Sequence, residues 1–351
     1  MPNVKILLVS HKPFKVPKGE YFVPIHAGRS IAMEKSKDGK IDKADLDWML
    51  KNTIGDDTGD NISDKNRYYS ECSALYWAWK NYDALGNPDY IGLMHYRRHF
   101  IFNDEYYVNN IKDDWHRALC YKNEDFIDDN YIKNIGLTDE NILKACTNYD
   151  LVVTKDTKFD LIGGYNLREN YEKTIPGSKV KDFDLLFDTI KKLYPEYVAA
   201  VDNNINGYKT SLYQMFIMPK DLFFEYCEFL FSILFEIEKQ LDFNEYTTNG
   251  KRVLGYLAER VLSAFVWKKQ ADGLNIMKLG VTEVEYPYED ETIEKIINSG
   301  CPSVFDYLRL KLKSYFLKGE AKQANKEGYQ GLRRRIKSYK KLKKLYKNFI
   351  S

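Results

Sequence analysis

One stretch of this 351-residue chain decides its fold: Tyr90-Ile91-Gly92-Leu93-Met94-His95-Tyr96-Arg97-Arg98-His99-Phe100. Its first half is short and apolar, and the turn residues Gly86-Asn87-Pro88-Asp89 come just before it. Both features favour a buried strand over a helix. Arg97 and Arg98 then follow the strand at its carboxyl end, which is the edge of an open α/β sheet where ligands bind.

Two adjacent arginines at such a position need a negative partner. The planar guanidinium of arginine matches phosphate oxygens, so one interpretation of Arg97 and Arg98, with His95 beside them, is a binding site for a diphosphate. The alternative is an ion-pair network with nearby acidic side chains. The spacing leaves both interpretations open.

Further strands and helices are expected on both sides of this stretch. Apolar runs predict strands at residues 4–10, 21–28, 149–156 and 213–219. Apolar residues at helical spacing predict helices at residues 66–82, 182–194, 195–204, 221–240 and 253–268. Residues 103–149 are polar and aromatic without a clear period, so we expect an irregular insertion there. The alternation of predicted strands and helices along the chain predicts an α/β fold.

The charge of the chain is divided unevenly. The formal net charge is +2, but residues 309–351 hold 15 Lys and Arg against two Glu, a net +13, which leaves −11 for residues 1–308. We therefore expect a main domain at residues 1–300 and a basic tail at residues 301–351. In the tail, leucines and aromatic residues alternate with basic ones, which predicts amphipathic helices of the kind that bind anionic membranes. A solvated terminal helix is the alternative, and we expect no nucleic-acid partner because the acidic body would repel a phosphate backbone.

The remaining composition points to a reduced, cytoplasmic protein. No stretch reaches the roughly 18 consecutive apolar residues of a membrane span, and the start lacks the apolar region of a signal peptide. The five cysteines are odd in number and contain no C-x-x-C pair, which favours neither a disulfide framework nor a zinc site.

Candidate site residues lie in three further segments. Ser10 and His11 follow the first predicted strand, where nucleotide-binding folds often hold the base and ribose, although a lone loop histidine is also commonly structural. The loop at residues 55–63 contains three acids and two glycines without the spacing of a calcium loop. Its Asp57 and Asp60 are candidates for contacts to sugar hydroxyls, or the loop is a plain turn. Glu259 lies in an apolar helical segment, so it either pairs with an arginine or faces the cleft.

Several of these segments together resemble the DUF4422 family of bacterial exopolysaccharide and capsular polysaccharide biosynthesis glycosyltransferases. The resemblance covers roughly residues 4–270. It is carried by four segments: Gly55-Asp56-Asp57-Thr58-Gly59-Asp60-Asn61-Ile62-Ser63, Glu71-Cys72-Ser73-Ala74-Leu75-Tyr76-Trp77-Ala78-Trp79-Lys80-Asn81, the stretch at residues 90–100, and Tyr213-Gln214-Met215-Phe216-Ile217-Met218. It implies a GT-A-like, Rossmann-related mixed sheet flanked by helices.

The resemblance also implies an activity. A sugar, galactose or galactofuranose by weak analogy, would move from a UDP-sugar to a hydroxyl of a glycan acceptor, lipid-linked, at the inner face of the cell membrane. Ser10 and His11 would hold the nucleoside, and His95, Arg97 and Arg98 the diphosphate. Asp57 and Asp60 would contact the sugar or acceptor, and the catalytic base would be Glu259 or Asp60.

The chain departs from the usual GT-A pattern at the metal site. GT-A enzymes usually place an Asp-x-Asp motif after a central strand, where it holds a divalent metal. That position here holds His95-Tyr96-Arg97-Arg98, while Asp45-Leu46-Asp47 and Asp182-Phe183-Asp184 lie in predicted helices or loops. We therefore expect the two arginines to replace the metal and no cofactor to be required, with Mg²⁺ or Mn²⁺ bound by the acidic loop as a fallback.

Two other classes of function stay open at this point. A non-catalytic glycan-binding subunit of a polysaccharide assembly complex would share the aromatic-rich composition. A nucleic-acid-binding protein would use the basic tail and would show strong salt-dependent retention on DNA or RNA. A nucleotidyltransferase is a closer enzymatic alternative, but it would normally carry a glycine-rich phosphate loop, and neither G-x-G-x-x-G nor G-x-x-x-x-G-K-[ST] occurs.

Overall fold

The computed structural model describes residues 1–34, 41–111, 114–313, 333 and 336–345. The chain divides into two compact units, Met1–Pro287 and Tyr288–Ser351. The first unit thus ends before residue 300, where the sequence placed the domain boundary. Among the described residues, we find no helix with both the length and the apolar character to cross a membrane.

The first unit is built on a mixed sheet with the strand order β3-β2-β1-β4-β10-β7-β11-β5, and β6 pairs with the far part of β11. Strands β1, β2, β3 and β4 are parallel, and β10 is antiparallel to both β4 and β7. A separate pair is formed by β8 and β9. The strands are β1 Val4–Ser10, β2 Phe22–His26, β3 Ile54–Gly55, β4 Tyr90–His95, β5 Phe100–Ile101, β6 Tyr121–Phe126, β7 Leu151–Thr154, β8 Thr157–Lys158, β9 Lys209–Thr210, β10 Phe216–Pro219 and β11 Ile276–Tyr286.

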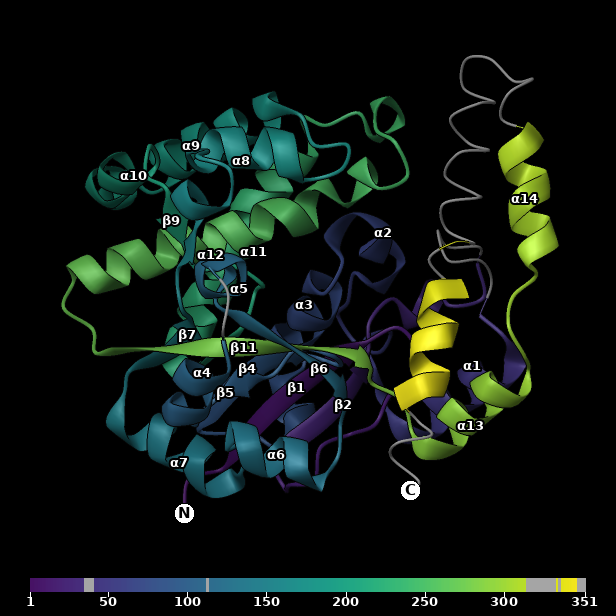
Figure 1. The fold of residues 1–351 in the computed structure, drawn as a ribbon. Coiled ribbons are helices and arrows are strands. Elements are labelled where there is room, and N and C mark those ends of the chain that lie inside the picture. Colours follow the sequence, from purple (N-terminus) through teal and green to yellow (C-terminus); the bar gives the residue numbers. More distant parts are fainter. Residues whose placement is uncertain (35–40, 112–113, 314–332, 334–335, 346–351) are drawn as a thin grey trace. The chain divides into compact units, whose positions relative to one another are not determined.

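Helices cover both faces of this sheet (Figure 1). In that view α3 and α8 to α12 lie above the sheet, and α4, α6 and α7 lie below it. The helices of the first unit are α1 Lys43–Asn52, α2 Asn66–Tyr69, α3 Cys72–Lys80, α4 Asp104–Asn110, α5 Asp114–Leu119, α6 Asp129–Ile135, α7 Asp139–Asn148, α8 Leu167–Thr174, α9 Val180–Leu193, α10 Val198–Asn204, α11 Lys220–Glu238 and α12 Val253–Ala271.

The sheet separates two hydrophobic cores. Successive side chains of a strand point to opposite faces, so Leu7 of β1 joins the core under α3, α11 and α12, while Ile6 and Leu8 join the core with α6 and α7. A strand buried on both faces reads as a continuous apolar run, which explains why β1 and β4 were predicted with nearly their observed bounds.

Two predictions about the elements were wrong. The helix expected at residues 66–82 is broken into α2 and α3, because Ser70 has a φ of 53° and a ψ of −131°. Residues 103–149 are not irregular but form α4, α5, β6, α6 and α7. Three of these helices begin at polar residues, Asn103, Asp128 and Thr138, whose side chains accept hydrogen bonds from the first-turn backbone. Their polar composition hid them from a search for apolar periodicity.

The described part of the second unit is largely helical. It contains α13, Asp290–Asn298, and α14, Val304–Lys313, together with a helical stretch at residues 336–345. Ile293, Ile336, Tyr339 and Leu342 are buried. The predicted tail helices at residues 307–349 lie partly outside the described residues.

Candidate functional site

The carboxyl ends of several parallel strands meet at one edge of the sheet. The register places Ser10 of β1 beside His26 of β2, and Val9 beside His95 of β4. Because β10 runs antiparallel to β4, the residues that precede it, Tyr213 and Gln214, reach the same edge. This edge is where ligands bind in open α/β sheets.

Arg97 and Arg98 lie in a tight turn that directly follows β4. His95 and Arg98 exchange backbone hydrogen bonds of 3.1 and 3.2 Å. The turn is also tied to both neighbours, since the Tyr96 amide donates to the Val9 carbonyl and the Val284 amide of β11 to the Arg97 carbonyl. The position of the two guanidiniums is therefore set by the sheet.

Both arginines contact the carboxylate of Glu283 on β11. Arg97 forms an ion pair with it, and Arg98 approaches it more loosely, with 3.4 Å between Nη2 and Oε1. The ion-pair network weighed in the sequence analysis is thus present in the structure. One carboxylate is shared by two guanidiniums, so the trio keeps a net positive charge, and the side chains of Arg97 and Arg98 remain 37% and 27% exposed.

His95 is held beside Arg98 as a neutral ring. Its Nε2 lies 2.7 Å from the Tyr213 carbonyl oxygen, an acceptor, so Nε2 carries the hydrogen. Burial, and then the Arg98 charge, lower the pKa of His95 to about 4. His95 therefore contributes a hydrogen-bond donor that orients the Tyr213 backbone, rather than a third positive charge.

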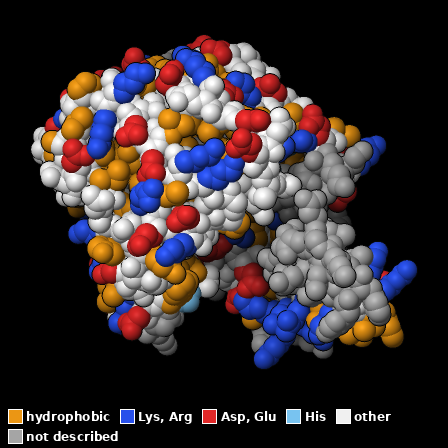
Figure 2. Space-filling model, turned by 90° about the horizontal axis from the view of Figure 1, so that it is seen from above, with side chains coloured by type: hydrophobic (Ala, Val, Ile, Leu, Met, Phe, Trp, Pro, Cys, Tyr) orange, Lys and Arg blue, Asp and Glu red, His pale blue; other side chains and the backbone are white. Residues whose placement is uncertain are grey.

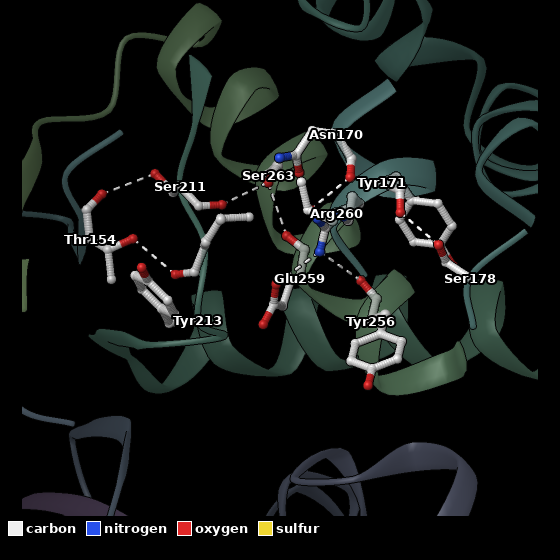
Figure 3. A network of polar contacts seen from close by, with 12 residues as sticks. Thr154, Asn170, Tyr171, Ser178, Ser211, Tyr213, Tyr256, Glu259, Arg260 and Ser263 are labelled. Atoms are coloured by element: carbon white, nitrogen blue, oxygen red, sulfur yellow. Dashed lines mark hydrogen bonds and ion pairs between the residues drawn. The ribbon is translucent and has the colours of Figure 1, made fainter. Parts of the chain in front are cut away.

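Glu259 lies on α12 in a network of polar contacts with Arg260 (Figure 3). Arg260 donates from Nη1 to the Glu259 carboxylate at 2.8 Å and to the Tyr256 carbonyl at 3.1 Å. Figure 3 shows Glu259 and Tyr213 on the same side of the network. Glu259 thus pairs with an arginine, which was one of the two alternatives, and it also lies within electrostatic range of Arg98 and His95.

Glu71 is a functional candidate that the sequence analysis missed. It precedes α3, and its carboxylate lies within electrostatic range of Arg252, Arg98 and Glu259. Two contacts bring this part of the chain to α12. Arg252 donates from Nε to Ser70 Oγ at 3.0 Å, and a Cβ at Gly255 would meet Ser70 Oγ at 2.7 Å, so only glycine permits the approach. The sequence offered one signal, an acid directly before the apolar run of α3.

The electrostatics of this group follow from burial among mixed charges. Burial raises the pKa of Glu71, although its own backbone amide, Arg252 and Arg98 oppose the shift. Burial likewise raises the pKa of Glu259, opposed by Arg260 and reinforced by Glu71. Burial lowers the pKa of Arg98, but the carboxylates of Glu283, Glu259 and Glu71 and the Tyr213 ring outweigh it, and its pKa is raised. The guanidinium remains charged.

Ser10 and His11 lie where the sequence placed them, at the end of β1. The Ser10 hydroxyl is used within its own turn, since it donates to the Lys12 carbonyl at 2.6 Å and accepts from the Lys12 amide at 3.1 Å. The His11 ring is exposed and meets the Tyr96 ring edge-on, with centroids 5.7 Å apart. The Ser10 hydroxyl therefore stabilises the loop, whereas the His11 side chain is exposed at the end of β1.

The acidic loop lies at another part of the edge, and its acids differ in kind. Asp56 is buried and accepts four hydrogen bonds, from the amides of Gly28 and Arg29 and from the hydroxyls of Ser63 and Ser73, at 2.5–3.0 Å. Asp56 is therefore a structural anchor.

Asp57 and Asp60, which the sequence analysis assigned to the sugar or acceptor and, for Asp60, to the catalytic base, are exposed. Asp60 accepts a hydrogen bond from the Tyr76 hydroxyl at 3.1 Å. No hydrogen bond or ion pair in the described part of the chain joins either of them to Arg98 or Glu259. The structure thus brings Glu259 together with His95 and Arg98, but it does not bring Asp57 or Asp60 into that group.

The two Asp-x-Asp sequences both lie in helices, as expected. Asp45 and Asp47 belong to α1, and Asp182 and Asp184 to α9, where Asp182 accepts from the Tyr246 hydroxyl at 2.7 Å. Within residues 1–34, 41–111, 114–313, 333 and 336–345, no three His, Cys, Asp or Glu side chains are grouped as metal ligands would be.

Comparisons with known proteins agree with this fold. The family model described as "Domain of unknown function (DUF4422)" matches residues 5–270. A solved structure of WbbM, described as a bifunctional glycosyltransferase in its apo form, is 33% identical with a TM-score of 0.68. The match covers 81% of this chain and 45% of the WbbM chain, so this chain spans about half the length of that protein. No curated protein matches the chain. The mixed sheet flanked by helices, expected from the sequence, is confirmed.

Proposed function

The chain belongs to the DUF4422 family, and we propose that it is a glycosyltransferase that moves a sugar from a UDP-sugar to a hydroxyl of a glycan acceptor. One observation carries this proposal: a chain 33% identical to a bifunctional glycosyltransferase places Arg97 and Arg98 side by side at the ligand-binding edge of its sheet. A nucleoside diphosphate is the leaving group of such a transfer, and fixed guanidiniums stabilise its developing charge.

Charge balance supports this role for the two arginines. Glu283 offers a single carboxylate to both, and the longer contact, that of Arg98, is the one more easily exchanged for a phosphate oxygen. Phosphate accepts bidentate hydrogen bonds from arginine in the same geometry as carboxylate. In the proposal, the donor diphosphate takes over part of the Glu283 interaction and His11 contacts the nucleoside.

The proposed transfer needs no metal cofactor. In the proposal, the guanidiniums of Arg97 and Arg98 stabilise the negative charge of the leaving diphosphate. In other enzymes a divalent ion supplies that positive charge. Asp57 and Asp60 are exposed on a loop at the same end of the sheet, and in the proposal they contact sugar or acceptor hydroxyls.

We further propose that the acceptor is membrane-linked and that α14 contacts an anionic membrane surface. Phe305, Leu308 and Leu312 recur at helical spacing and are 85%, 45% and 61% exposed. Arg309 and the lysines of the same helix supply the charge that attracts anionic lipids. In this proposal the protein acts at the inner face of the cell membrane, in the synthesis of a capsular polysaccharide, exopolysaccharide or O-polysaccharide.

The proposal includes no nucleic-acid partner. On the one face that Figure 2 displays, Lys and Arg side chains are interspersed with Asp and Glu side chains. Binding to a phosphate backbone usually requires a continuous basic surface.

A donor screen tests the proposed function. Purified protein is melted with UDP-, GDP- and CMP-sugars, and we expect only the UDP series to raise the melting temperature, because a ligand of the folded state stabilises it by mass action. Release of UDP from UDP-galactose or UDP-galactofuranose is then followed. The second candidate function, a non-catalytic glycan-binding subunit, predicts neither stabilisation by UDP nor its release.

A further inference from the structure

Glu71 is placed by an unusual backbone bend. Ser70, the residue before it, adopts a positive φ of 53°, which is rare for a residue with a side chain. The bend ends α2, starts a new helix at Cys72 and brings Glu71 beside α12. Backbone strain of this kind costs free energy and is found mostly where function requires it.

The two carboxylates of the site differ in their partners. Glu259 is held by Arg260, with 2.8 Å between Oε2 and Nη1. The Glu71 carboxylate interacts with its own backbone amide but forms no hydrogen bond or ion pair with another side chain that the structure describes. Arg98 lies within electrostatic range of both, yet its only ion pair in the described chain is with Glu283. Arg98 and Glu259 thus each have an ion-pair partner of their own, whereas Glu71 has no side-chain partner in the described chain.

This difference in partners decides which carboxylate is the better base. A charge-assisted hydrogen bond from arginine stabilises the ionised carboxylate and makes it a weaker proton acceptor. Glu259 is in that situation. Glu71 has no arginine bonded to it among the described residues, so apart from the contact to its own backbone amide its oxygens are open to a proton from the acceptor hydroxyl.

We propose that Glu71, rather than Glu259, is the general base of the transfer and that Glu259 is a positioning residue. The proposal rests on the proposed function. Glu259 fixes Arg260 and supplies negative charge beside Arg98, while Glu71 takes the proton.

An inverting transfer then proceeds as one balanced step. The acceptor O–H gives its proton to a Glu71 carboxylate oxygen, and the acceptor oxygen forms a bond to the anomeric carbon of the sugar. The bond between that carbon and the diphosphate oxygen breaks, and its electron pair leaves with UDP. Arg97 and Arg98 stabilise the charge that develops on the departing phosphate.

One further observation separates Glu71 from the other candidates. Burial raises the pKa of both Glu71 and Glu259, so burial distinguishes the two from exposed acids and not from each other. Asp60, the other base considered from the sequence, is exposed. It accepts a hydrogen bond from the Tyr76 hydroxyl, and Tyr76 lies more than one helical turn after Glu71.

The test compares Glu71→Gln and Glu259→Gln with the unmodified chain, using UDP-galactose and UDP-galactofuranose as donors and water as the acceptor. Folding is checked by thermal melting, and donor binding by the melting shift that UDP produces. We expect Glu71→Gln to keep the UDP shift, to lower kcat by about 100-fold or more and to abolish the acid limb of the pH profile. Glu259→Gln is expected to keep that limb. Glu71→Asp, which retains a carboxylate, should recover part of the rate and the limb.

Several outcomes would overturn the assignment. Turnover of Glu71→Gln close to that of the unmodified chain would do so, as would an acid limb that disappears with Glu259→Gln but persists in Glu71→Gln. If Glu71→Gln does not fold, the other two variants decide the assignment. It is overturned if Glu71→Asp keeps the full rate of the unmodified chain and Glu259→Gln loses the acid limb of the pH profile. If the unmodified chain neither gains stability from UDP nor releases it, the proposed function itself fails, and the role of Glu71 fails with it.

Discussion

The guanidinium of Arg98 lies over the ring of Tyr213, with 5.2 Å between Arg98 Cζ and the ring centroid. The Tyr213 carbonyl is at the same time hydrogen-bonded to His95, and Tyr213 and Gln214 both have positive φ, 76° and 50°. An aromatic face attracts a cation, and a residue held in a strained conformation presents that face at a fixed place. The charge of Arg98 is therefore oriented before any ligand binds, which is the condition for electrostatic catalysis.

The first prediction concerns this arginine. Replacing Arg98 by alanine should lower kcat for UDP release by about 100-fold or more, because the variant lacks a fixed charge at the leaving group. The fold should survive, since Glu283 keeps its pair with Arg97. Arg168→Ala is a matched control, because Arg168 pairs with Asp184 on the exposed surface of α8 and α9. Activity of Arg98→Ala close to that of the control would exclude a role for Arg98 in the transfer.

The second prediction concerns metal dependence. Activity should persist in excess EDTA, since Arg97 and Arg98 supply the positive charge and both Asp-x-Asp sequences lie in helices. The measurement is UDP release with and without the chelator. Complete loss of activity that Mn²⁺ restores would show that the acidic loop with Asp57 and Asp60 recruits a metal, contrary to our proposal.

The third prediction separates two neighbouring acids. Asp56→Ala removes a buried carboxylate that accepts four hydrogen bonds, so the free energy of unfolding should fall by about 3 kcal/mol or more. Asp57→Ala, at an exposed position, should change it by less than about 0.5 kcal/mol. Urea denaturation of both variants provides the measurement. Equal losses of stability would mean that the loop is not anchored through Asp56.

How far the sequence predicts this molecule depends on the kind of element. Strands buried on both faces, such as β1 and β4, are recognisable as apolar runs. Strand β11 was not predicted, because polar residues interrupt its apolar ones: Glu283 and Glu285 alternate with the buried Val284 and Tyr286 at its end. Since Glu283 is the partner of both arginines, missing that strand also hid their ion pair.

The site was predictable only where neighbours in sequence are neighbours in space. His95, Arg97 and Arg98 follow one strand, so their grouping could be read from the sequence. Glu71 and Glu259 are brought together by packing of α2 against α12 and by the bend at Ser70. A positive φ at a serine leaves no pattern in the sequence, so nothing predicted that pairing.

The fourth prediction concerns the pH dependence of stability. Histidine ordinarily has a pKa of about 6.5, but burial, and then the nearby His95, lower the pKa of His99 to about 3. The unfolded chain therefore binds a proton below about pH 6.5 that the folded chain does not. Stability from this group is complete above that pH and falls as the pH drops toward the folded pKa, by about 1.4 kcal/mol per pH unit.

Comparison with a variant isolates this histidine from the carboxyls that titrate nearby. Urea denaturation at about pH 6 and pH 5 should show a larger loss of stability for the unmodified chain than for His99→Gln. The expected difference between the two losses is about 1.2 kcal/mol, because the unfolded histidine is only partly protonated at pH 6. Equal losses would mean that His99 is not kept neutral by burial in the folded chain.

The last prediction concerns the exposed apolar residues of α14. Replacing Phe305 and Leu312 by serine removes two large apolar side chains from the helix while its basic residues stay, so binding to anionic vesicles should weaken at least tenfold, because burial of each side chain in the interface contributes about 1.5–3 kcal/mol. Leu161→Ser is the control, since Leu161 is 58% exposed on the first unit. Sedimentation with vesicles of phosphatidylglycerol and phosphatidylcholine measures the bound fraction. Raising the salt concentration should release the unmodified chain as well, because screening weakens the attraction of the basic residues. If the double variant sediments like the Leu161→Ser control, α14 is not the element that contacts the membrane.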